Sequence, residues 1–236
     1  NDFHNAIIID KNQIPHFIVE KLISNQIKQI VITGMGTCYT AATAIAKYMR
    51  EMLRKFIINI SVEPHIASEG SAFYLEHKMD DILVIVIAQS GTTVDTNVYV
   101  QMAKDRGAMS IALANKREGD VTFIVDGTLY IGSGRDIEIA VPSTKTYTAQ
   151  VILGYILTLY FCCKLNQKYK KHNSLLINNI HSLRKTTDLI DETFEYIKDG
   201  SLFNKIRDYP LGVCTLTLGK CMEATKLPYN YIFIWL

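Results

Sequence analysis

Short runs of isoleucine and valine alternate along the chain with longer segments in which apolar residues recur at helical spacing. Continuous apolar runs of this kind are typical of parallel strands, whose sheets are covered by helices on both faces. Five runs are predicted to be strands: Gln29–Thr33, Ile57–Val62, Asp81–Ala88, Met109–Ala114 and Leu129–Ile131. The alternation therefore predicts an α/β fold with a parallel sheet between two layers of helices.

The segments between and around these runs are predicted to be helices. Ala41–Arg54 and Thr96–Asp105 connect strands, Ile14–Ile27 precedes the first strand, and Thr144–Leu165 follows the last. Within the last helix, Val151–Cys163 is nearly all apolar, but a membrane span needs about 20 such residues. A buried helix is therefore favoured over a membrane span.

A charged cluster, KYKKHNS at Lys168–Ser174, favours an exposed connection and a domain boundary. After it, a helix over Ser182–Lys198 and a buried strand over Leu211–Leu218 are predicted. We expect one complete domain over residues 1–175 and a second segment over 176–236 that is too short for another α/β domain.

Composition narrows the function classes. Of the 236 residues, 48% are hydrophobic and 20% charged, which is the balance of a folded protein with a real core. The net charge of +2 disfavours nucleic acid as a partner, so any phosphate recognition must be local. Five cysteines without paired spacing suggest neither a disulfide framework nor a metal site, and no cofactor is expected. The lack of a leader favours the cytoplasm, without a membrane partner.

Ligands of parallel sheets bind beyond the carboxyl ends of the strands, which directs attention to three strand-to-helix turns. In the first, Gly34–Tyr39 (GMGTCY), two glycines allow close backbone approach and the following helix end favours an anion. Tyr39 stands where a dinucleotide-binding turn needs a third small residue, which disfavours a nicotinamide cofactor. A tight turn that needs glycine for its geometry is the alternative.

The second turn, Ala88–Thr93, follows the most apolar predicted strand. It offers three hydroxyls, the amide of Gln89 and, at Gly91, no Cβ to block close approach. Such an uncharged cradle can bind a phosphate monoester through many hydrogen bonds, without Lys or Arg. Ordinary helix capping by serine and threonine is the alternative.

The third segment, Glu138–Thr146, joins the last predicted strand to the long helix. Pro142 fixes an extended turn, and Ser143 or Thr144 can cap the helix, so capping explains much of the segment. Lys145 lies in the first turn, where a cation is disfavoured. Because a lysine is unfavourable at this position of a helix, its presence suggests a role in function or in contact with a partner.

Together these segments resemble the SIS (sugar isomerase) domain family. The similarity is to the amino-terminal SIS repeat in the isomerase half of the glutamine–fructose-6-phosphate aminotransferases (glucosamine-6-phosphate synthases). It rests on four motifs in order: GMGTCY at 34–39, ASE at 67–69, AQSGTTVDT at 88–96, and the run from Glu138 through PSTKTYTAQ to Gln150. The resemblance covers roughly residues 14–165.

The resemblance implies a three-layer, flavodoxin-like sandwich with a five-stranded parallel sheet. It also implies a homodimer that binds a phosphorylated ketose or amino sugar, such as fructose 6-phosphate or glucosamine 6-phosphate. Residues 1–175 would then be the SIS domain. Residues 176–236 would be a linker helix and the incomplete start of a second SIS repeat.

The resemblance also implies roles for individual residues. By its pattern, the phosphate is held in the second turn by Gln89, Ser90, Gly91 and Thr93, the sugar lies against Thr37 and Cys38, and Val141 and Ser143 contact its hydroxyls. Two positions depart from the family, since Ala88 and Cys38 stand where serines are usual. Losing one neutral hydrogen bond costs about 0.5–1.5 kcal/mol, so weaker binding or a shifted substrate is expected.

Isomerisation needs a base that moves a proton between adjacent carbons. Glu69, in the ASE motif, is the first candidate for this catalytic role, and the alternative is that it caps its own helix. His65 and Glu138 are the other acid–base groups of the domain. Glu223 and Lys226 lie in a stretch that vaguely resembles the start of the second repeat, with a spacing one residue short.

Two functions remain open on the sequence. One is an enzyme that isomerises a hexose 6-phosphate and couples this to amination or deamination, without a glutaminase domain in this chain. The other is a non-catalytic module that binds or senses a sugar phosphate. The neutral stretch before the first strand is too short for a DNA-binding helix-turn-helix, which disfavours a transcription factor.

Overall fold

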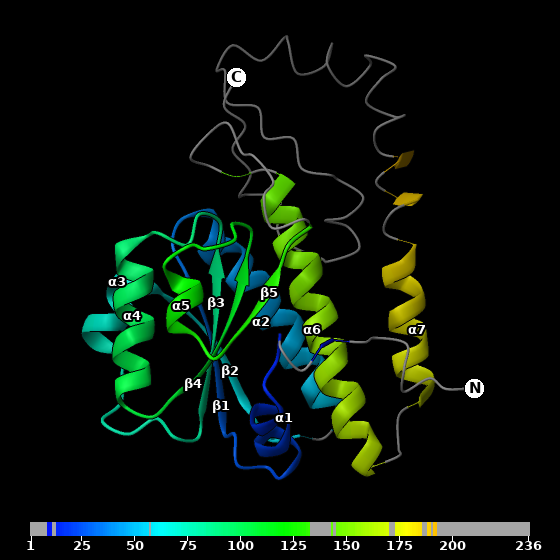
Figure 1. The fold of residues 1–236 in the computed structure, drawn as a ribbon. Helices are drawn as coiled ribbons and strands as arrows, with labels where there is room; N and C mark the ends of the chain where they lie inside the picture. Colours follow the sequence, from blue (N-terminus) through cyan, green and yellow to red (C-terminus); the bar gives the residue numbers. More distant parts are fainter. Residues whose placement is uncertain are drawn as a thin grey trace. The chain divides into compact units, whose positions relative to one another are not determined.

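The computed structural model describes residues 9–10, 13–56, 58–132, 143, 145–169, 173–185, 188–189 and 191–192. All five predicted strands are present and form one sheet in which every neighbouring pair is parallel (Figure 1). The strands are β1 (Gln29–Gly34), β2 (Ser61–Ile66), β3 (Ile82–Ala88), β4 (Met109–Ala114) and β5 (Gly127–Tyr130). Their order is β2-β1-β3-β4-β5, which confirms the predicted α/β class.

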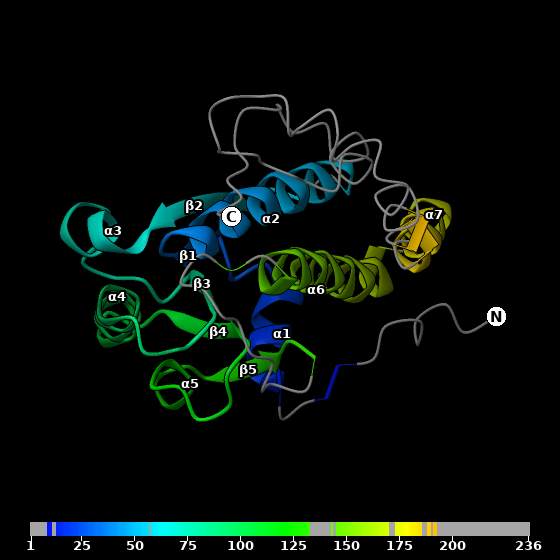
Figure 2. The same cartoon turned by 90° about the horizontal axis from the view of Figure 1, so that it is seen from above.

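Helices cover both faces of the sheet (Figure 2). On one face lie α1 (His16–Ile23), α2 (Thr37–Lys55) and α6 (Lys145–Tyr169), and on the other α3 (Ala67–Phe73), α4 (Val94–Asp105) and α5 (Val121–Ile124). Every residue of the central strand β3 is buried, because helices close it off from water on both sides. This three-layer sandwich is the architecture that the resemblance implied.

The chain divides into two compact units, Asn1–Ile177 and Asn178–Leu236, and the sheet belongs to the first. A further helix, α7 (Asn173–Arg184), begins earlier than the helix predicted over Ser182–Lys198. Part of that predicted helix, the strand predicted over 211–218 and the final residues lie outside the described residues.

Two strands are displaced from their predicted positions. β2 begins at Ser61 and continues through Pro64 to Ile66, beyond the apolar run at 57–62 from which it was predicted. A proline is accepted here because β2 is an edge strand and needs hydrogen-bond partners on one side only. β5 begins at Gly127, before the predicted Leu129. In both cases the pairing neighbour, rather than the local apolar run, decides where the strand lies.

The charged cluster predicted to be an exposed connection is partly helical. α6 continues through Lys168 to Tyr169, and α7 begins at Asn173. Within the described residues, the stretch Lys145–Asn166 of α6 is long and apolar enough to cross a membrane by length and composition alone. Of its apolar window, 56% is buried inside the protein, and Leu157, Phe161 and Cys162 are fully buried, as in a core helix.

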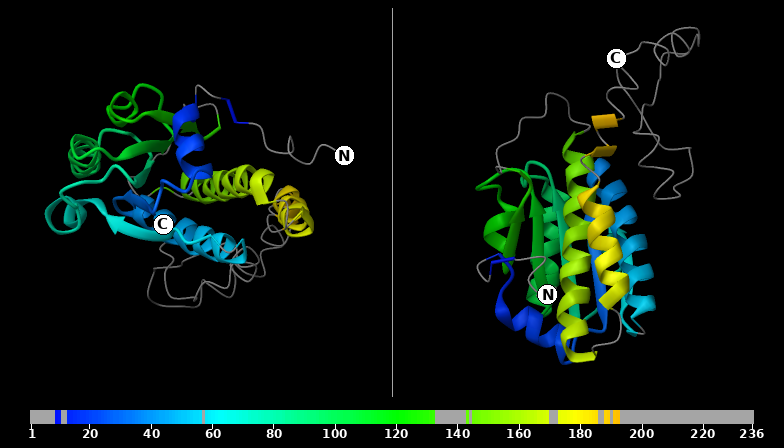
Figure 3. Two further views of the ribbon diagram at one scale, coloured as in Figure 1. Left: turned by 90° about the horizontal axis from the view of Figure 1, so that it is seen from below. Right: turned by 90° about the vertical axis from the view of Figure 1, so that its right-hand side faces the viewer.

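α2 and α6 run side by side over one face of the sheet (Figure 3). Their close approach depends on Gly154, because a Cβ at that position would lie 2.5 Å from Cγ1 and 2.8 Å from Cγ2 of Ile45 on α2. Ile45 is fully buried, so its side chain has little space into which to retreat. A small residue at position 154 therefore sets the distance between the two helices.

We expect Gly154→Ala to lower the free energy of unfolding by about 1–2 kcal/mol, since the steric cost exceeds the gain in helix propensity. Urea denaturation measures this change. The control is the double variant Gly154→Ala/Ile45→Ala, in which the added methyl fills space that the shortened side chain leaves. The double variant should lose less free energy of unfolding than the two single variants lose together. Additive losses would contradict the packing argument.

Candidate functional site

The carboxyl ends of β1 and β3 lie next to each other in the sheet and lead into α2 and α4. The first and second turns singled out in the sequence therefore lie side by side. Gly34 makes this possible, because a Cβ there would lie 2.9 Å from Cβ of Cys38 and 3.1 Å from the carbonyl oxygen of Ile87. The glycine lets the first turn of α2 lie directly against the end of β3.

The start of α2 leaves its first amide groups unoccupied by a side-chain cap. Gly36 is the N-cap residue, with φ +57°, a conformation that favours glycine, and within the described residues no side chain caps this helix. The first N–H groups of a helix have no partner inside the helix. In α2 the N–H groups of Cys38 and Tyr39 instead bond to the carbonyl oxygens of Met35 and Gly36, over 3.1 Å and 3.0 Å.

The second turn is held by its carbonyl groups. The carbonyl oxygen of Ala88 accepts the N–H of Asn115 over 3.1 Å, and that of Gln89 accepts the N–H of Lys116 over 3.1 Å. The carbonyl oxygen of Gly91 accepts the N–H of Val121 over 2.9 Å. The segment after β4 thus fixes three carbonyl acceptors of this turn.

Gly91 and Gly119 meet at this contact. Gly91 has φ +74°, and a Cβ on Gly119 would lie 2.6 Å from the carbonyl oxygen of Ser90. Asn97, in the first turns of α4, adds a bond from its Nδ2 to the carbonyl oxygen of Gly91 over 3.3 Å. Asn97 was missed in the sequence analysis, because a polar residue in a helix carries no signal of a contact with the preceding loop.

The hydroxyls of the second turn form a local chain. Ser90 Oγ lies 3.0 Å from Thr92 Oγ1 and accepts the N–H of Thr92 over 3.3 Å. Thr93 is the N-cap residue of α4, yet among the described residues its side chain makes no capping bond. Capping by Thr93, the alternative considered above, is therefore not observed, and the start of α4 keeps its free N–H groups.

The third segment and the helix that follows it, α6, each contact the first turn through one side chain. Ser143 Oγ lies 3.0 Å from Thr37 Oγ1, across 106 positions of sequence. Gln150 Nε2, on α6, donates to Cys38 Sγ over 3.4 Å. The structure thus brings Thr37, Cys38 and Ser143 together, while Val141 and Glu138 lie outside the described residues.

Cys38, in the first turn, contacts both the second turn and α6. Burial raises the pKa of its thiol, and hydrogen bonds from Gln150 and from the backbone of Gln89 oppose that rise. No charged group is among these causes, so the thiol stays protonated at neutral pH. It lies at the site as a neutral polar group.

Glu69 lies in the first turn of α3, directly after β2, and is exposed to solvent. The N-cap residue of α3 is Ile66, and among the described residues no side chain caps this helix. The capping role considered for Glu69 is therefore not observed. Glu69 and Thr37 follow neighbouring strands, β2 and β1, at the same edge of the sheet.

His65, another acid–base candidate, is engaged elsewhere. Its Nδ1 lies 3.0 Å from the hydroxyl of Tyr99, a fully buried residue of α4, and its Nε2 lies 3.9 Å from Glu63. Burial lowers the pKa of His65, against the influence of Glu63. The contact with Tyr99 joins β2 to α4 and engages one nitrogen of the imidazole.

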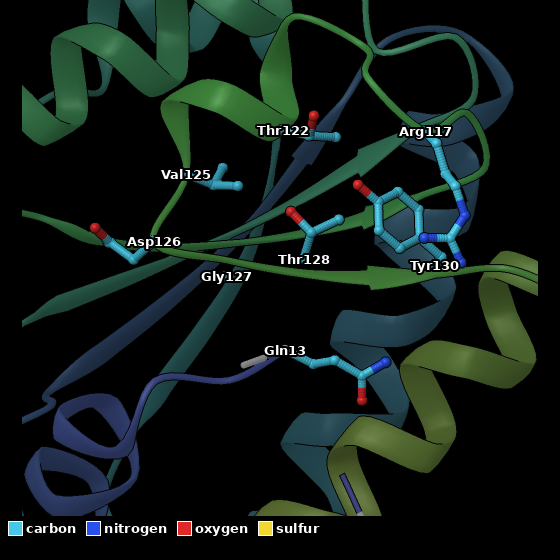
Figure 4. A pocket seen from close by; sticks show the side chains of 8 residues that line it. All are labelled: Gln13, Arg117, Thr122, Val125, Asp126, Gly127, Thr128 and Tyr130. Atoms are coloured by element: carbon cyan, nitrogen blue, oxygen red, sulfur yellow. The ribbon is translucent and has the colours of Figure 1, made fainter. Parts of the chain in front are cut away.

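A hollow of about 390 Å³ opens beside β5 (Figure 4). Arg117 lies over the ring of Tyr130, 4.6 Å from its centre, and Asp126 pairs with Lys104 over 2.8 Å. None of the predicted site residues lines this hollow. In the part of the chain that the structure describes, no three His, Cys, Asp or Glu side chains are grouped to hold a metal ion.

The fold, together with the residues at the carboxyl ends of β1 and β3, defines a class of protein. It is a parallel α/β sandwich with an uncharged cradle of hydroxyls, amides and helix starts at that edge of the sheet. The SIS domain model matches residues 23–160, and the chain belongs to the SIS domain family. This confirms the resemblance drawn from the four motifs.

Relatives found by sequence bear the name of the aminotransferases that the four motifs resemble. The chain is 33% identical over 183 residues to the glutamine–fructose-6-phosphate aminotransferase of Fusobacterium nucleatum, which covers 74% of this chain and 29% of that protein. It is 39% identical over 150 residues to the enzyme of the same name from Clostridium acetobutylicum, covering 63% and 23%. The chain thus spans less than a third of the length of these relatives.

Solved structures share the fold. The C-terminal domain of glucosamine-fructose-6-phosphate aminotransferase from Francisella tularensis superposes with a TM-score of 0.66 at 22% identity, covering 84% of this chain and 53% of that one. Glucosamine-6-phosphate deaminase from Thermotoga maritima superposes with a TM-score of 0.52 at 15% identity, covering 76% and 56%.

Proposed function

We propose that this SIS domain binds a phosphorylated ketose or amino sugar, such as fructose 6-phosphate or glucosamine 6-phosphate. The observation that carries the proposal is the meeting of three separate segments at one edge of the sheet. Thr37 contacts Ser143, and Cys38 contacts both Gln150 and the backbone of Gln89. All three segments present neutral hydrogen-bonding groups there. The names of the proteins compared above contain fructose 6-phosphate or glucosamine 6-phosphate, which belong to this class of compound.

The second turn is the proposed phosphate site. Gln89, Ser90, Gly91 and Thr93 lie between the end of β3 and the start of α4, a helix of 12 residues with an uncapped start. Helix N–H groups and hydroxyls stabilise an anion without a basic side chain. This arrangement accounts for a phosphate-binding role in a chain of nearly neutral net charge.

The first and third segments form the proposed sugar site. Thr37, Cys38 and Ser143 supply two hydroxyls and a thiol, which suit the hydroxyl groups of a ketose, and Val141 belongs to the same proposed set. Glu69 is the proposed base. Its carboxylate would take the proton from the carbon next to the carbonyl and return it to the adjacent carbon, which exchanges ketose and aldose. Amination or deamination of the hexose 6-phosphate would be coupled to this step.

A second candidate is a non-catalytic sugar-phosphate-binding or sensing module. It would use the same cradle of neutral groups to hold the sugar phosphate, without a base. We propose residues 1–175 as the SIS domain and 176–236 as a linker helix with the start of a second repeat, which the candidate module would not need for binding.

We propose that the protein acts in the cytoplasm as a homodimer, without nucleic acid or membrane partners. Among the described residues, four of the seven exposed large hydrophobic side chains gather on or next to α3 and α4: Phe73, Tyr74, Val94 and Val98. Since α4 begins at the proposed phosphate turn, a dimer through this face would enclose the site. Exposed apolar patches of this kind mark interaction surfaces.

Fructose 6-phosphate and glucosamine 6-phosphate at millimolar concentration should raise the thermal unfolding midpoint of the protein, because a ligand that binds only the folded state stabilises it. Ser90→Ala and Thr93→Ala should each weaken binding by roughly threefold to tenfold, and together they should abolish the shift. Thr43→Ala is the matched control, since Thr43 is exposed and, among the described residues, its hydroxyl bonds only to Tyr39 of its own helix. No shift with either sugar in the unmodified protein would refute the binding proposal.

Glu69→Gln should leave the affinity for the sugar phosphate within about twofold of the original while lowering ammonia-dependent interconversion by roughly a hundredfold or more, as expected for removal of a general base. Product formation measured by chromatography, with affinity measured by calorimetry, separates the two effects. Binding without turnover in the unmodified protein would favour the non-catalytic module.

Analytical ultracentrifugation at micromolar concentration should give twice the mass of one chain. The double variant Phe73→Ser/Val98→Glu should sediment as a monomer, because it places a charge in the apolar face of α3 and α4. The control Phe17→Ser changes an exposed residue of α1, on the other face of the sheet, and should remain dimeric. A monomeric unmodified protein would exclude the proposed dimer.

A further inference from the structure

Gln150 contacts the proposed site, although the sequence analysis gave it no role beyond the end of a motif. Its side chain is fully buried on α6, and its Nε2 donates to Cys38 Sγ over 3.4 Å. Its Oε1 has no hydrogen-bond partner among the residues that the structure describes. A buried oxygen without a partner lowers stability, so an apolar residue would fit this position better if packing alone decided it.

The sulfur of Cys38 receives a second donor. The backbone N–H of Gln89, the first residue after β3, also hydrogen-bonds to it. Cys38 itself is 8% exposed, at the second position of α2. With two N–H groups bonded to the sulfur, the thiol proton is left to donate to a third group.

The packing of three elements fixes this arrangement. Gly34 lets Cys38 lie against the end of β3, and Gly154, one helical turn beyond Gln150, lets α6 approach α2 at Ile45. Both glycines are places where a Cβ would collide with the neighbouring element. The position of Gln150 relative to the sulfur is therefore set by backbone approach rather than by a flexible surface contact.

We propose that Gln150 is a positioning residue that orients the thiol of Cys38 as a hydrogen-bond donor to an oxygen of the bound sugar phosphate. The proposal rests on the proposed function and deepens it, because it assigns the ligand an oxygen acceptor at Cys38. Gln150 acts through Cys38 and does not itself touch the ligand. Cys38 serves as a neutral donor and not as a nucleophile, since burial disfavours its thiolate.

Calorimetric titration with fructose 6-phosphate and glucosamine 6-phosphate tests the proposal in the full chain. Gln150→Met keeps the length of the side chain and removes the N–H donor, and Gln150→Leu serves as a second variant. Each should weaken binding by roughly threefold to tenfold. The thermal unfolding midpoint without ligand should stay unchanged or rise, because the unpartnered oxygen is gone. A merely structural role for Gln150 predicts instead that stability falls with affinity.

A double-mutant cycle with Cys38→Ala decides whether the two residues act together. The double variant Gln150→Met/Cys38→Ala should bind no more weakly than the weaker single variant, because both changes remove one contact. Thr158→Val is the matched control on the same helix, since Thr158 is fully buried and, in the part of the chain that the structure describes, its hydroxyl bonds only to the carbonyl oxygen of Gly154. It should bind as the unmodified protein does. Unchanged affinity in Gln150→Met, or losses that multiply in the double variant, would overturn the proposal.

A measurement without ligand separates this proposal from the proposed function. Alkylation of Cys38, followed by site-resolved mass spectrometry, should reach its half-maximal rate at a higher pH in Gln150→Met, because the variant lacks an N–H group that stabilises the thiolate. Thr158→Val should leave that pH unchanged. If the unmodified protein binds neither sugar, the proposed function fails, whereas an unchanged alkylation profile in Gln150→Met refutes the role of Gln150 in orienting the thiol.

Discussion

The close approach of α2 to its neighbours is the constraint on which the site depends. At Gly34 the first turn of α2 lies against the end of β3, and at Gly154 the helix α6 lies against Ile45 in the middle of α2. Interiors of proteins pack without space for an extra methyl group at such contacts. Because α2 is held from both sides, Cys38 is fixed between the phosphate turn and Gln150, and Thr37 reaches Ser143.

The proposed phosphate site consists of neutral groups. Three carbonyl groups of the second turn are bonded to the segment after β4, and the turn also carries the hydroxyls of Ser90, Thr92 and Thr93. The start of α4 adds further N–H groups, since Thr93 does not cap it. An anion held in this way needs no lysine or arginine as a counterion. Such a site therefore does not show in the net charge of the chain.

The sequence could predict the fold because its signals are local. Buried parallel strands read as apolar runs, and β4 lies at the residues predicted for it. The edge strand β2 was misplaced because Pro64 interrupts its apolar pattern, and only pairing with β1 shows that it is a strand. The short helix α5 (Val121–Ile124) has too few residues to show a periodicity at all.

The order and spacing of four motifs were enough to identify the SIS family, since each motif lies at a strand-to-helix junction whose residues are set by local geometry. Tertiary structure alone decided which side chains meet. Thr37 and Ser143 are 106 positions apart, and their contact exists because α2 and α6 pack on the same face of the sheet. The same packing gives Gln150 a partner at the site, and the position of α4 gives His65 a partner in Tyr99. Such contacts depend on where whole elements lie, which no local pattern records.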